Sequence, residues 1–181
     1  MSTIPCTQRQ KVSGFTLLEL MFTLLVAAIL IGVAVPSFRG MAASSRLTTQ
    51  ANDLVSAMNF ARSEAITRNA NMTLCRTGTD ASTTCAAAVV PWTNWIVLNP
   101  AGNVVRRGFL DRYNGALRVD SDLTSNSITF GSDGMARTGG ALVNNSQFTV
   151  CSSHSATDNI RRVVIGAGSR LSTTKQSGAC T

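Results

Sequence analysis

The chain is poor in the residues on which most enzymes and metal sites depend. It contains one histidine, His154, and its five cysteines form no CxxC pair, which disfavours a zinc site. A single histidine also gives no catalytic triad. Phe130 stands where a nucleophile elbow needs glycine, and Leu171 stands where a dinucleotide fingerprint needs its third glycine. We therefore expect no enzyme activity, no cofactor, no metal and no small-molecule substrate.

Charged and aromatic residues are also few, at 14% and 6%, but hydrophobic residues make up 44%, which excludes a disordered chain. The 16 Lys and Arg outnumber the 9 Asp and Glu, and only two of the 16 are lysines. The net charge of +7 allows nucleic acid, acidic lipid or acidic protein as a partner and does not choose among them.

Residues 15–35 form an apolar run whose only charge is Glu19. As a helix the run matches the hydrocarbon core of a bilayer, about 30 Å. Arg9 and Lys11 are the only charges before it, so the positive-inside rule predicts a cytoplasmic N-terminus. A cleaved secretory signal is the alternative, but its apolar region is usually shorter, and it has no use for a costly carboxylate.

A carboxylate inside a membrane requires a cationic partner, and nothing else in the run carries charge. Cleavage between Gly14 and Phe15 would supply one, because it frees an α-amino group about one helical turn from Glu19. Glu19 could then pair with the amine of its own chain or with that of a neighbour. In the second case Glu19 would act as an assembly device.

Residues 13–20, Ser-Gly-Phe-Thr-Leu-Leu-Glu-Leu, resemble the class III signal of type IV pilins and type II secretion pseudopilins. The resemblance implies that a prepilin peptidase cuts after Gly14 and methylates Phe15, and that Glu19 guides subunit docking. Pro36 is similar to the helix-kinking proline of many pilins and is expected to bend the helix or to end its first part. The implied location is the bacterial inner membrane, single-pass with a periplasmic head, and later a pilus or pseudopilus fibre with other minor and major pilins.

Beyond Pro36 the sequence becomes amphipathic, and the helix is expected to end near Asn69–Asn71. One helical face carries apolar residues at spacings of three and four, expected to pack on a head domain: Leu47, Ala51, Leu54, Met58, Ala61 and Ala65. Short β-like runs follow, with candidate strands at 72–76, 92–98, 104–110, 117–120, 127–130, 147–151 and 160–165.

The expected fold class is therefore α+β, with a long N-terminal helix packed on an antiparallel, β-rich head. The domains are the leader 1–14, the membrane and assembly helix 15–35, the amphipathic helix 36–71 and the head 72–181. Residues 60–65, Phe-Ala-Arg-Ser-Glu-Ala, resemble the signature at the end of the long helix in the GspH/FimT family, and Trp92 and Trp95 resemble its next strand. That family includes FimT/FimU minor pilins and the type II secretion pseudopilin H.

The number of cysteines fits the proposed cleavage. Five is odd for an exported protein, and removing the leader deletes Cys6 and leaves four. Four cysteines allow three pairings, among which the sequence does not decide, although proximity favours Cys75 with Cys85 and Cys151 with Cys180. Disulfides imply the periplasm or the cell surface.

Basic residues near the C-terminus are candidates for gripping the DNA backbone: Arg161, Arg162, Arg170 and Lys175. FimT-type minor pilins that bind DNA carry Gly-Arg-x-Arg, and the similar stretch here, residues 169–172, keeps one of the two arginines. Strand alternation predicts that Arg161 and Arg162 lie on opposite faces. A solvated set of arginines is the interpretation that we favour.

Three functions follow from the sequence. The leading hypothesis is a minor pilin at or near the tip of a type IV pilus, where it helps to prime assembly. The alternatives are a GspH-type pseudopilin in type II protein export and a DNA-binding minor pilin for natural transformation.

Overall fold

The computed structural model describes residues 14–87, 91–110, 117–152 and 157–180. The expected leader, apart from Gly14, lies outside the described residues, and so does His154. The chain divides into two units, one ending at Arg39 and one running from Gly40 to Thr181. All the strands belong to the second unit, which we call the folded unit.

Helix α1 (Leu17–Thr67) contains both the expected membrane helix and the expected amphipathic helix. Helical geometry continues through Pro36, so the helix does not end there, and a bend at this residue stays a prediction. The six apolar residues predicted to face the head are all fully buried, which confirms the amphipathic pattern.

The end of α1 has a definite local cause. Asn69 adopts a left-handed conformation, with φ of 48°. The N–H of Ala70 donates to the carbonyl of Ala65 at 3.0 Å, and the N–H of Asn69 donates to that of Ile66 at 3.2 Å. These two bonds form a Schellman motif, in which asparagine takes the place usually held by glycine. The helix therefore stops at Thr67, slightly before the expected boundary.

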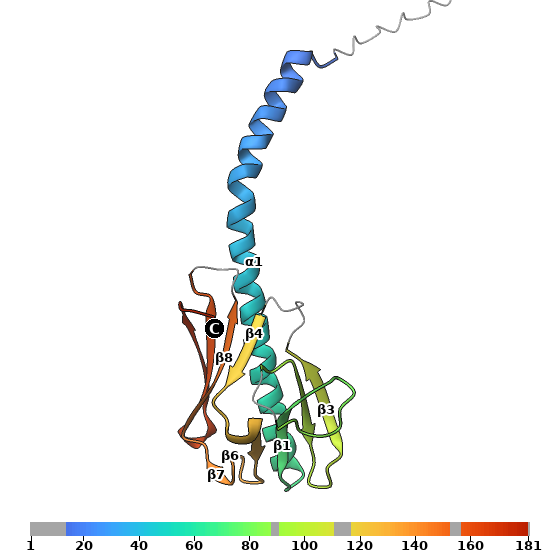
Figure 1. The fold of residues 1–181 in the computed structure, drawn as a ribbon, viewed down its shortest axis with the longest axis vertical. Helices are drawn as coiled ribbons and strands as arrows, with labels where there is room; N and C mark the ends of the chain where they lie inside the picture. The colour runs from blue at the N-terminus through green and yellow to red at the C-terminus, as the bar shows by residue number, and fades with distance from the viewer. Residues whose placement is uncertain (1–13, 88–90, 111–116, 153–156, 181) are drawn as a thin grey trace, which may run out of the picture. The chain divides into compact units, whose positions relative to one another are not determined.

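Two antiparallel sheets complete the folded unit (Figure 1). The six-stranded sheet has the order β3-β2-β1-β5-β6-β7, and the four-stranded sheet has the order β10-β9-β8-β4. The strands are β1 (Met72–Thr77), β2 (Asn94–Leu98), β3 (Val104–Phe109), β4 (Leu117–Ser121), β5 (Ser127–Phe130), β6 (Ala136–Thr138), β7 (Ala141–Leu142), β8 (Asn145–Ser152), β9 (Ile160–Gly166) and β10 (Leu171–Gln176). Two short 3-10 helices, η1 (Thr124–Asn126) and η2 (Ala167–Ser169), precede β5 and β10.

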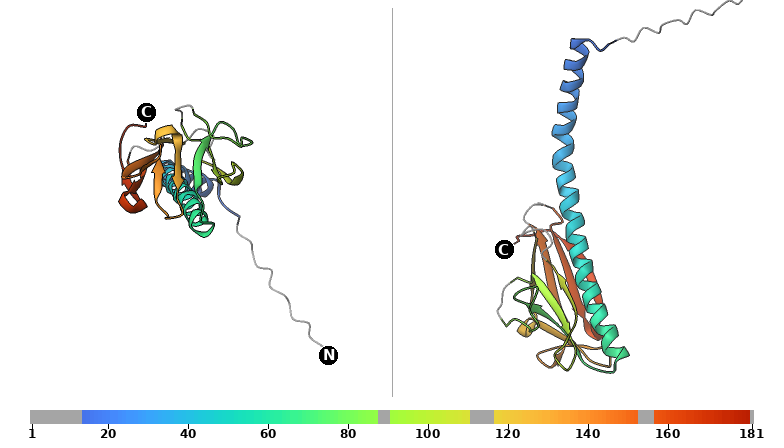
Figure 2. Two further views of the ribbon diagram at one scale, coloured as in Figure 1. Left: turned by 90° about the horizontal axis from the view of Figure 1, so that it is seen from below. Right: turned by 90° about the vertical axis from the view of Figure 1, so that its right-hand side faces the viewer.

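The second half of α1 packs along one side of both sheets, as the right-hand view of Figure 2 shows. Trp92 joins the two sheets at the centre of the core. Its ring meets the ring of Phe148 edge-on, with centroids 5.0 Å apart, and its Nε1 donates to Ser121 Oγ at 3.0 Å. Its backbone N–H donates to the carbonyl of Val119 in β4, which explains why β2 begins at Asn94 and not at Trp92. The α+β architecture expected from the sequence is confirmed.

All seven candidate strands are present, but three strands were not expected. β6 and β7 are very short, and β10 is polar and largely exposed. An exposed edge strand needs no alternation of apolar residues, which is the signal by which strands are found in a sequence. The Gly-rich stretch before β10 is a turn that follows the Val-rich strand β9, as expected.

Candidate functional site

The first turn of α1 holds Glu19 by a local capping interaction. Thr16 precedes the helix, and its Oγ1 accepts from the N–H of Glu19 at 3.2 Å, while its carbonyl accepts from the N–H of Leu20 at 3.1 Å. Thr16 therefore occupies the N-cap and Glu19 the third helical position, the spacing of a capping box. A carboxylate is also favoured there by the helix dipole. The Thr-x-x-Glu signal was in the sequence, but our sequence reasoning missed it.

The first half of α1 exposes its large apolar side chains on every side. Phe15, just before the helix, is 79% exposed, and every leucine and isoleucine from Leu17 to Ile31 is more than half exposed. In the part of the chain that the structure describes, α1 is the one helix long and apolar enough to cross a membrane. A helix that is apolar all round needs lipid or other protein around it. This segment therefore suggests membrane anchoring and, later, packing against other helices.

Arg161 is a structural residue of the folded unit, which corrects its candidacy as a DNA contact. Its side chain is 1% exposed. Its guanidinium donates to Ser44 Oγ at 2.8 Å and Thr48 Oγ1 at 3.3 Å on α1, and to the carbonyls of Asp158 at 2.7 Å and Ile160 at 3.1 Å. These bonds attach β9 to the helix and leave no face of the guanidinium open to a phosphate.

The other three basic candidates do not form one surface. Arg162 lies on the opposite face of β9 from Arg161, as strand alternation predicts, and is half-buried. Lys175 is exposed and pairs in register with Arg161, so it lies on the opposite face of the sheet from Arg162. Arg170 is exposed at the turn between β9 and β10. The structure therefore separates residues that the sequence places close together.

The turn that presents Arg170 is fixed by its neighbour Ser169. Ser169 is buried and left-handed, with φ of 59°. Its Oγ accepts from the N–H of Ala136 in β6 at 2.6 Å, and its carbonyl accepts from Arg62 Nη1 at 3.1 Å. Arg62 belongs to the Phe-Ala-Arg-Ser-Glu-Ala segment, so this segment positions the turn. The left-handed conformation also explains why glycine would fit at this position.

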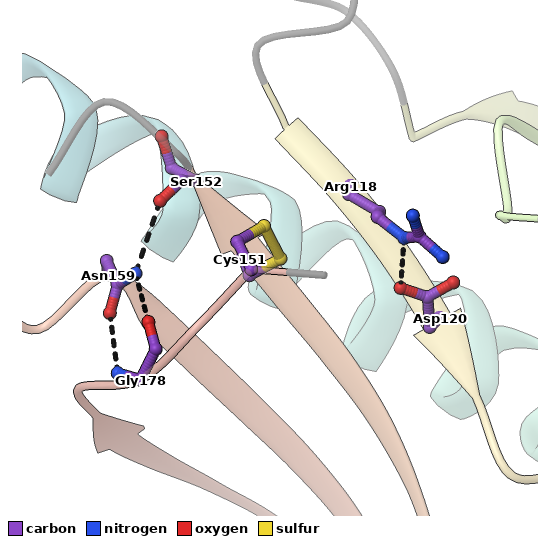
Figure 3. Close-up of a disulfide and its surroundings, with 7 residues drawn as sticks. Arg118, Asp120, Cys151, Ser152, Asn159 and Gly178 are labelled. Carbon is purple, nitrogen blue, oxygen red and sulfur yellow. Dashed lines mark hydrogen bonds and ion pairs between the residues drawn. A yellow bond between two sulfur atoms is a disulfide. The ribbon is translucent and has the colours of Figure 1, made fainter.

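Two disulfides close segments of the folded unit, with the pairing that proximity favours. Cys75 bonds to Cys85 and Cys151 to Cys180, with Cα separations of 5.5 and 5.6 Å. Figure 3 shows the second disulfide and the side chain of Asn159, which binds the C-terminal segment. Its Nδ2 donates to the carbonyl of Gly178 at 2.8 Å, and its Oδ1 accepts from the N–H of Gly178 at 3.0 Å. The C-terminal segment is thus held to β8 by the disulfide and to the residue just before β9 by these hydrogen bonds.

Three ion pairs lie on the surface of the described part of the folded unit, and one of them joins Arg68 to Glu64 at the end of α1. Arg118 Nε is 2.7 Å from Asp120 Oδ2 on β4, near the second disulfide (Figure 3). Nη2 of Arg137 in β6 is 2.6 Å from Oδ2 of Asp133 in the β5–β6 turn. The hydrogen bond from Arg137 holds the pKa of Asp133 well below its usual range, and the N–H of Met135 lowers it further. This turn follows Phe130, the residue that stands where a nucleophile elbow would need glycine.

Residues 14–87, 91–110, 117–152 and 157–180 contain no cluster of three His, Cys, Asp or Glu that would hold a metal.

A cation next to two aromatic rings is the feature that sequence reasoning missed. The Arg106 guanidinium on β3 lies 4.8 Å from the ring centroid of Phe60 on α1 and 5.9 Å from that of Trp95 on β2. It borders a hollow of about 610 Å³ beside α1, which we call the Arg106 groove, lined also by Asn52, Val55, Ser56, Asn59, Phe60 and Ser63. No local signal reveals this cluster, because its members come from three elements that only the fold brings together.

The family model described as "Type II transport protein GspH" matches residues 50–169, and the model of the prokaryotic N-terminal methylation motif matches residues 9–35. No curated protein sequence matches the chain.

Solved pilin-like structures share its fold. Two crystal forms of the type IV minor pilin FimU of Pseudomonas aeruginosa (strain PAO1) superpose with TM-scores of 0.55 and 0.52 at 18% and 17% identity. They cover 76% and 75% of this chain and 96% and 100% of the FimU chains. The minor pseudopilin EpsH from the type 2 secretion system of Vibrio cholerae has a TM-score of 0.49 at 10% identity, over 72% of this chain and 97% of EpsH.

Proposed function

The chain belongs to the GspH family of pilin-like proteins, and on that premise we propose that it is a minor pilin, a structural subunit at or near the tip of a type IV pilus that helps to prime assembly. The observation that carries the proposal is the first half of α1, an exposed apolar helix that carries Glu19 in its first turn. Lipid covers such a helix before assembly, and neighbouring helices cover it in a fibre. The folded unit then contacts other pilins.

Processing at the start of the helix completes this proposal. A prepilin peptidase would cut after Gly14 and methylate Phe15, as the N-terminal methylation motif at residues 9–35 supports. The new α-amino group would then lie within about a turn of Glu19. In the fibre we propose that Glu19 pairs with the Phe15 amine of a neighbour, which neutralises both charges in an apolar bundle. The disulfides favour a periplasmic folded unit.

Glu19→Gln is the sharpest test, because glutamine serves at the third position of a capping box but carries no charge. We expect this variant to be inserted and cleaved like the parent chain but to be incorporated poorly into fibres. Thr16→Val is the matched control, since it removes the capping hydroxyl and leaves the carboxylate. Immunoblots of sheared fibres and of membranes would measure both. Normal incorporation of Glu19→Gln together with loss in Thr16→Val would show that capping, and not charge, is what matters.

A pseudopilin in type II protein export is the second candidate, and the description of the matching family favours it. FimU, which shares the fold, is a type IV minor pilin, and this favours the first. Deletion of the gene separates the two. A minor pilin is required for surface pili, whereas a pseudopilin is required for release of exported proteins. Neighbouring genes for other minor pilins, or for secretion-system components, give the same discrimination.

A DNA-binding minor pilin is the third candidate, and the exposed Arg170 on its ordered turn is the feature that favours it. Arg161 takes no part, because it is buried. If the folded unit binds DNA, the affinity should fall steeply with salt and on Arg170→Gln or Lys175→Gln. A gel shift at low salt without a retarded band eliminates this role.

A further inference from the structure

We propose that the Arg106 groove binds an acidic segment of a partner protein, with a carboxylate of that segment on the Arg106 guanidinium. The inference rests on the proposed function, in which the folded unit works in contact with other proteins. Beyond the proposed function, it specifies where on the folded unit one such contact lies and which chemistry the partner has. The occupant is a peptide segment with an aspartate or glutamate and small apolar neighbours.

Strand β3 presents Arg106 and Arg107 to different sides. Arg106 pairs in register with Val97 and Gly108 with Trp95, so Arg106 and Gly108 share the side of the sheet that faces α1. Arg107 lies on the other side, where its Nη1 donates to the carbonyl of Asp80. Of the two arginines of this strand, Arg106 is thus the one whose guanidinium is available to a ligand.

Two rings hold the Arg106 guanidinium in place without using its donors. The central carbon of the Arg106 guanidinium lies over the rings of Phe60 and Trp95, and a cation–π contact uses the charge of the group and not its N–H donors. Among the described residues, no carboxylate pairs with Arg106. A pre-positioned, uncompensated guanidinium suits bidentate binding of a carboxylate.

Trp95 places a buried indole beside this cation. Its side chain is 5% exposed, and its Nε1 has no hydrogen-bond partner among the described residues. Trp95 and Arg106 both line a second, smaller hollow of about 90 Å³, which also touches Ser56 and Phe109. A Cβ at Gly108 would lie 2.4 Å from the Trp95 ring, so only glycine permits this packing. A buried N–H without an acceptor is costly, and because Nε1 is itself covered, its signal reports on the packing of the Trp95 ring beside Arg106 and not on a direct bond to a ligand.

The helix side of the groove favours a peptide over a nucleic acid. It carries Asn52, Asn59 and Ser63, whose amides and hydroxyl can bond a peptide backbone, next to the apolar Val55 and Phe60. A nucleic-acid backbone repeats its charge at every nucleotide and needs several cations. Arg106 is the charged residue that lines the groove, and the charged residues that line the smaller hollow, Asp53, Arg106 and Arg107, sum to one positive charge. A single carboxylate matches this charge, and a phosphate backbone does not.

The test uses the full mature chain in detergent micelles and two acetylated, amidated peptides, Ala-Val-Glu-Val-Ala and Ala-Val-Gln-Val-Ala. The indole N–H signals in a ¹H–¹⁵N spectrum give the readout, assigned with Trp95→Phe. We expect the Glu peptide to shift the Trp95 signal saturably and to leave the Trp92 signal unchanged. Arg106→Gln should weaken the binding about tenfold or more. Arg170→Gln, which removes another exposed arginine at a turn distant in the sequence, should leave it unchanged.

Three results would overturn the proposal. These are equal binding of the Glu and Gln peptides, unchanged binding by Arg106→Gln, and no shift of the Trp95 signal by either peptide. Oligothymidylate is the third probe, and a shift of the Trp95 signal by it alone would assign the groove to nucleic acid. The unchanged Trp92 signal shows in each variant that the core is folded. The binding assay needs no fibre, so its failure would not be confused with poor incorporation of Glu19→Gln.

Discussion

Replacement of Arg161 by alanine tests whether this arginine holds β9 to α1. The substitution removes the hydrogen bonds to Ser44 and Thr48 on the helix and to the carbonyls of Asp158 and Ile160. Each partly buried carbonyl left without a donor costs about 1 kcal/mol, at the low end of the usual range. The lost side-chain methylenes cost about 0.8 kcal/mol each.

One effect opposes this loss. Arg161 is a buried cation, and no carboxylate pairs with it in the described part of the chain, so its removal also relieves a desolvation penalty. We expect the hydrogen bonds and packing to prevail, because every partner is an oriented acceptor. Arg161→Ala should therefore lower the free energy of unfolding by about 2–4 kcal/mol. Arg161→Met keeps most of the packing volume and should cost about 1–2 kcal/mol.

Urea unfolding of residues 40–181, which have their own core and both disulfides, would measure these changes by tryptophan fluorescence. Arg162→Gln is the matched control, since it removes the same charge from the other face of β9. A variant Arg161→Ala as stable as the parent chain would refute the structural role. An Arg161→Met variant more stable than the parent would show that desolvation of the cation outweighs its hydrogen bonds.

Three further changes probe other parts of the folded unit. The side-chain amide of Gln50 is fully buried and has no hydrogen-bond partner among the described residues, so Gln50→Leu should raise the free energy of unfolding by about 1 kcal/mol or more. Ser169→Gly relaxes the left-handed backbone but leaves a buried N–H in β6 without an acceptor, so urea unfolding should show a net loss of about 1 kcal/mol. The hydrogen bond from Arg137 stabilises ionised Asp133. The contribution of this bond to the free energy of unfolding is present above the ordinary carboxyl pKa and is lost as the pH falls through the lowered pKa of Asp133. Arg137→Gln should therefore raise the Asp133 pKa in an NMR titration. Unchanged stability in the first two variants, or an unchanged titration in the third, would contradict these assignments.

The parts of the fold that follow from local pattern were predictable. Residues at spacings of three and four mark the buried face of α1, and alternating apolar runs mark the strands that carry the core. The polar strand β10 has no such pattern, because an exposed edge strand buries little. Alternation also predicted that Arg161 and Arg162 face opposite ways. It could not say which one faces the core, since that depends on where β9 packs against α1.

The site was predictable only where it is local in sequence. Glu19, its spacing from Phe15 and the surrounding apolar run can all be read along the chain. The cluster of Arg106, Phe60 and Trp95 cannot, because its three side chains meet through the register of β2 with β3 and the packing of α1 on the sheet. Neither the strand register nor the packing of the helix can be recognised from the sequence of any one segment.

The most direct measurement for the account as a whole is the mass of the N-terminal peptide of the chain isolated from fibres or membranes. A processed fibre subunit should begin at Phe15 and carry one methyl group on its α-amine. A peptide that retains Met1, or that begins beyond Val35, would contradict the account, because Glu19 would then have no neighbouring amine or would itself be lost.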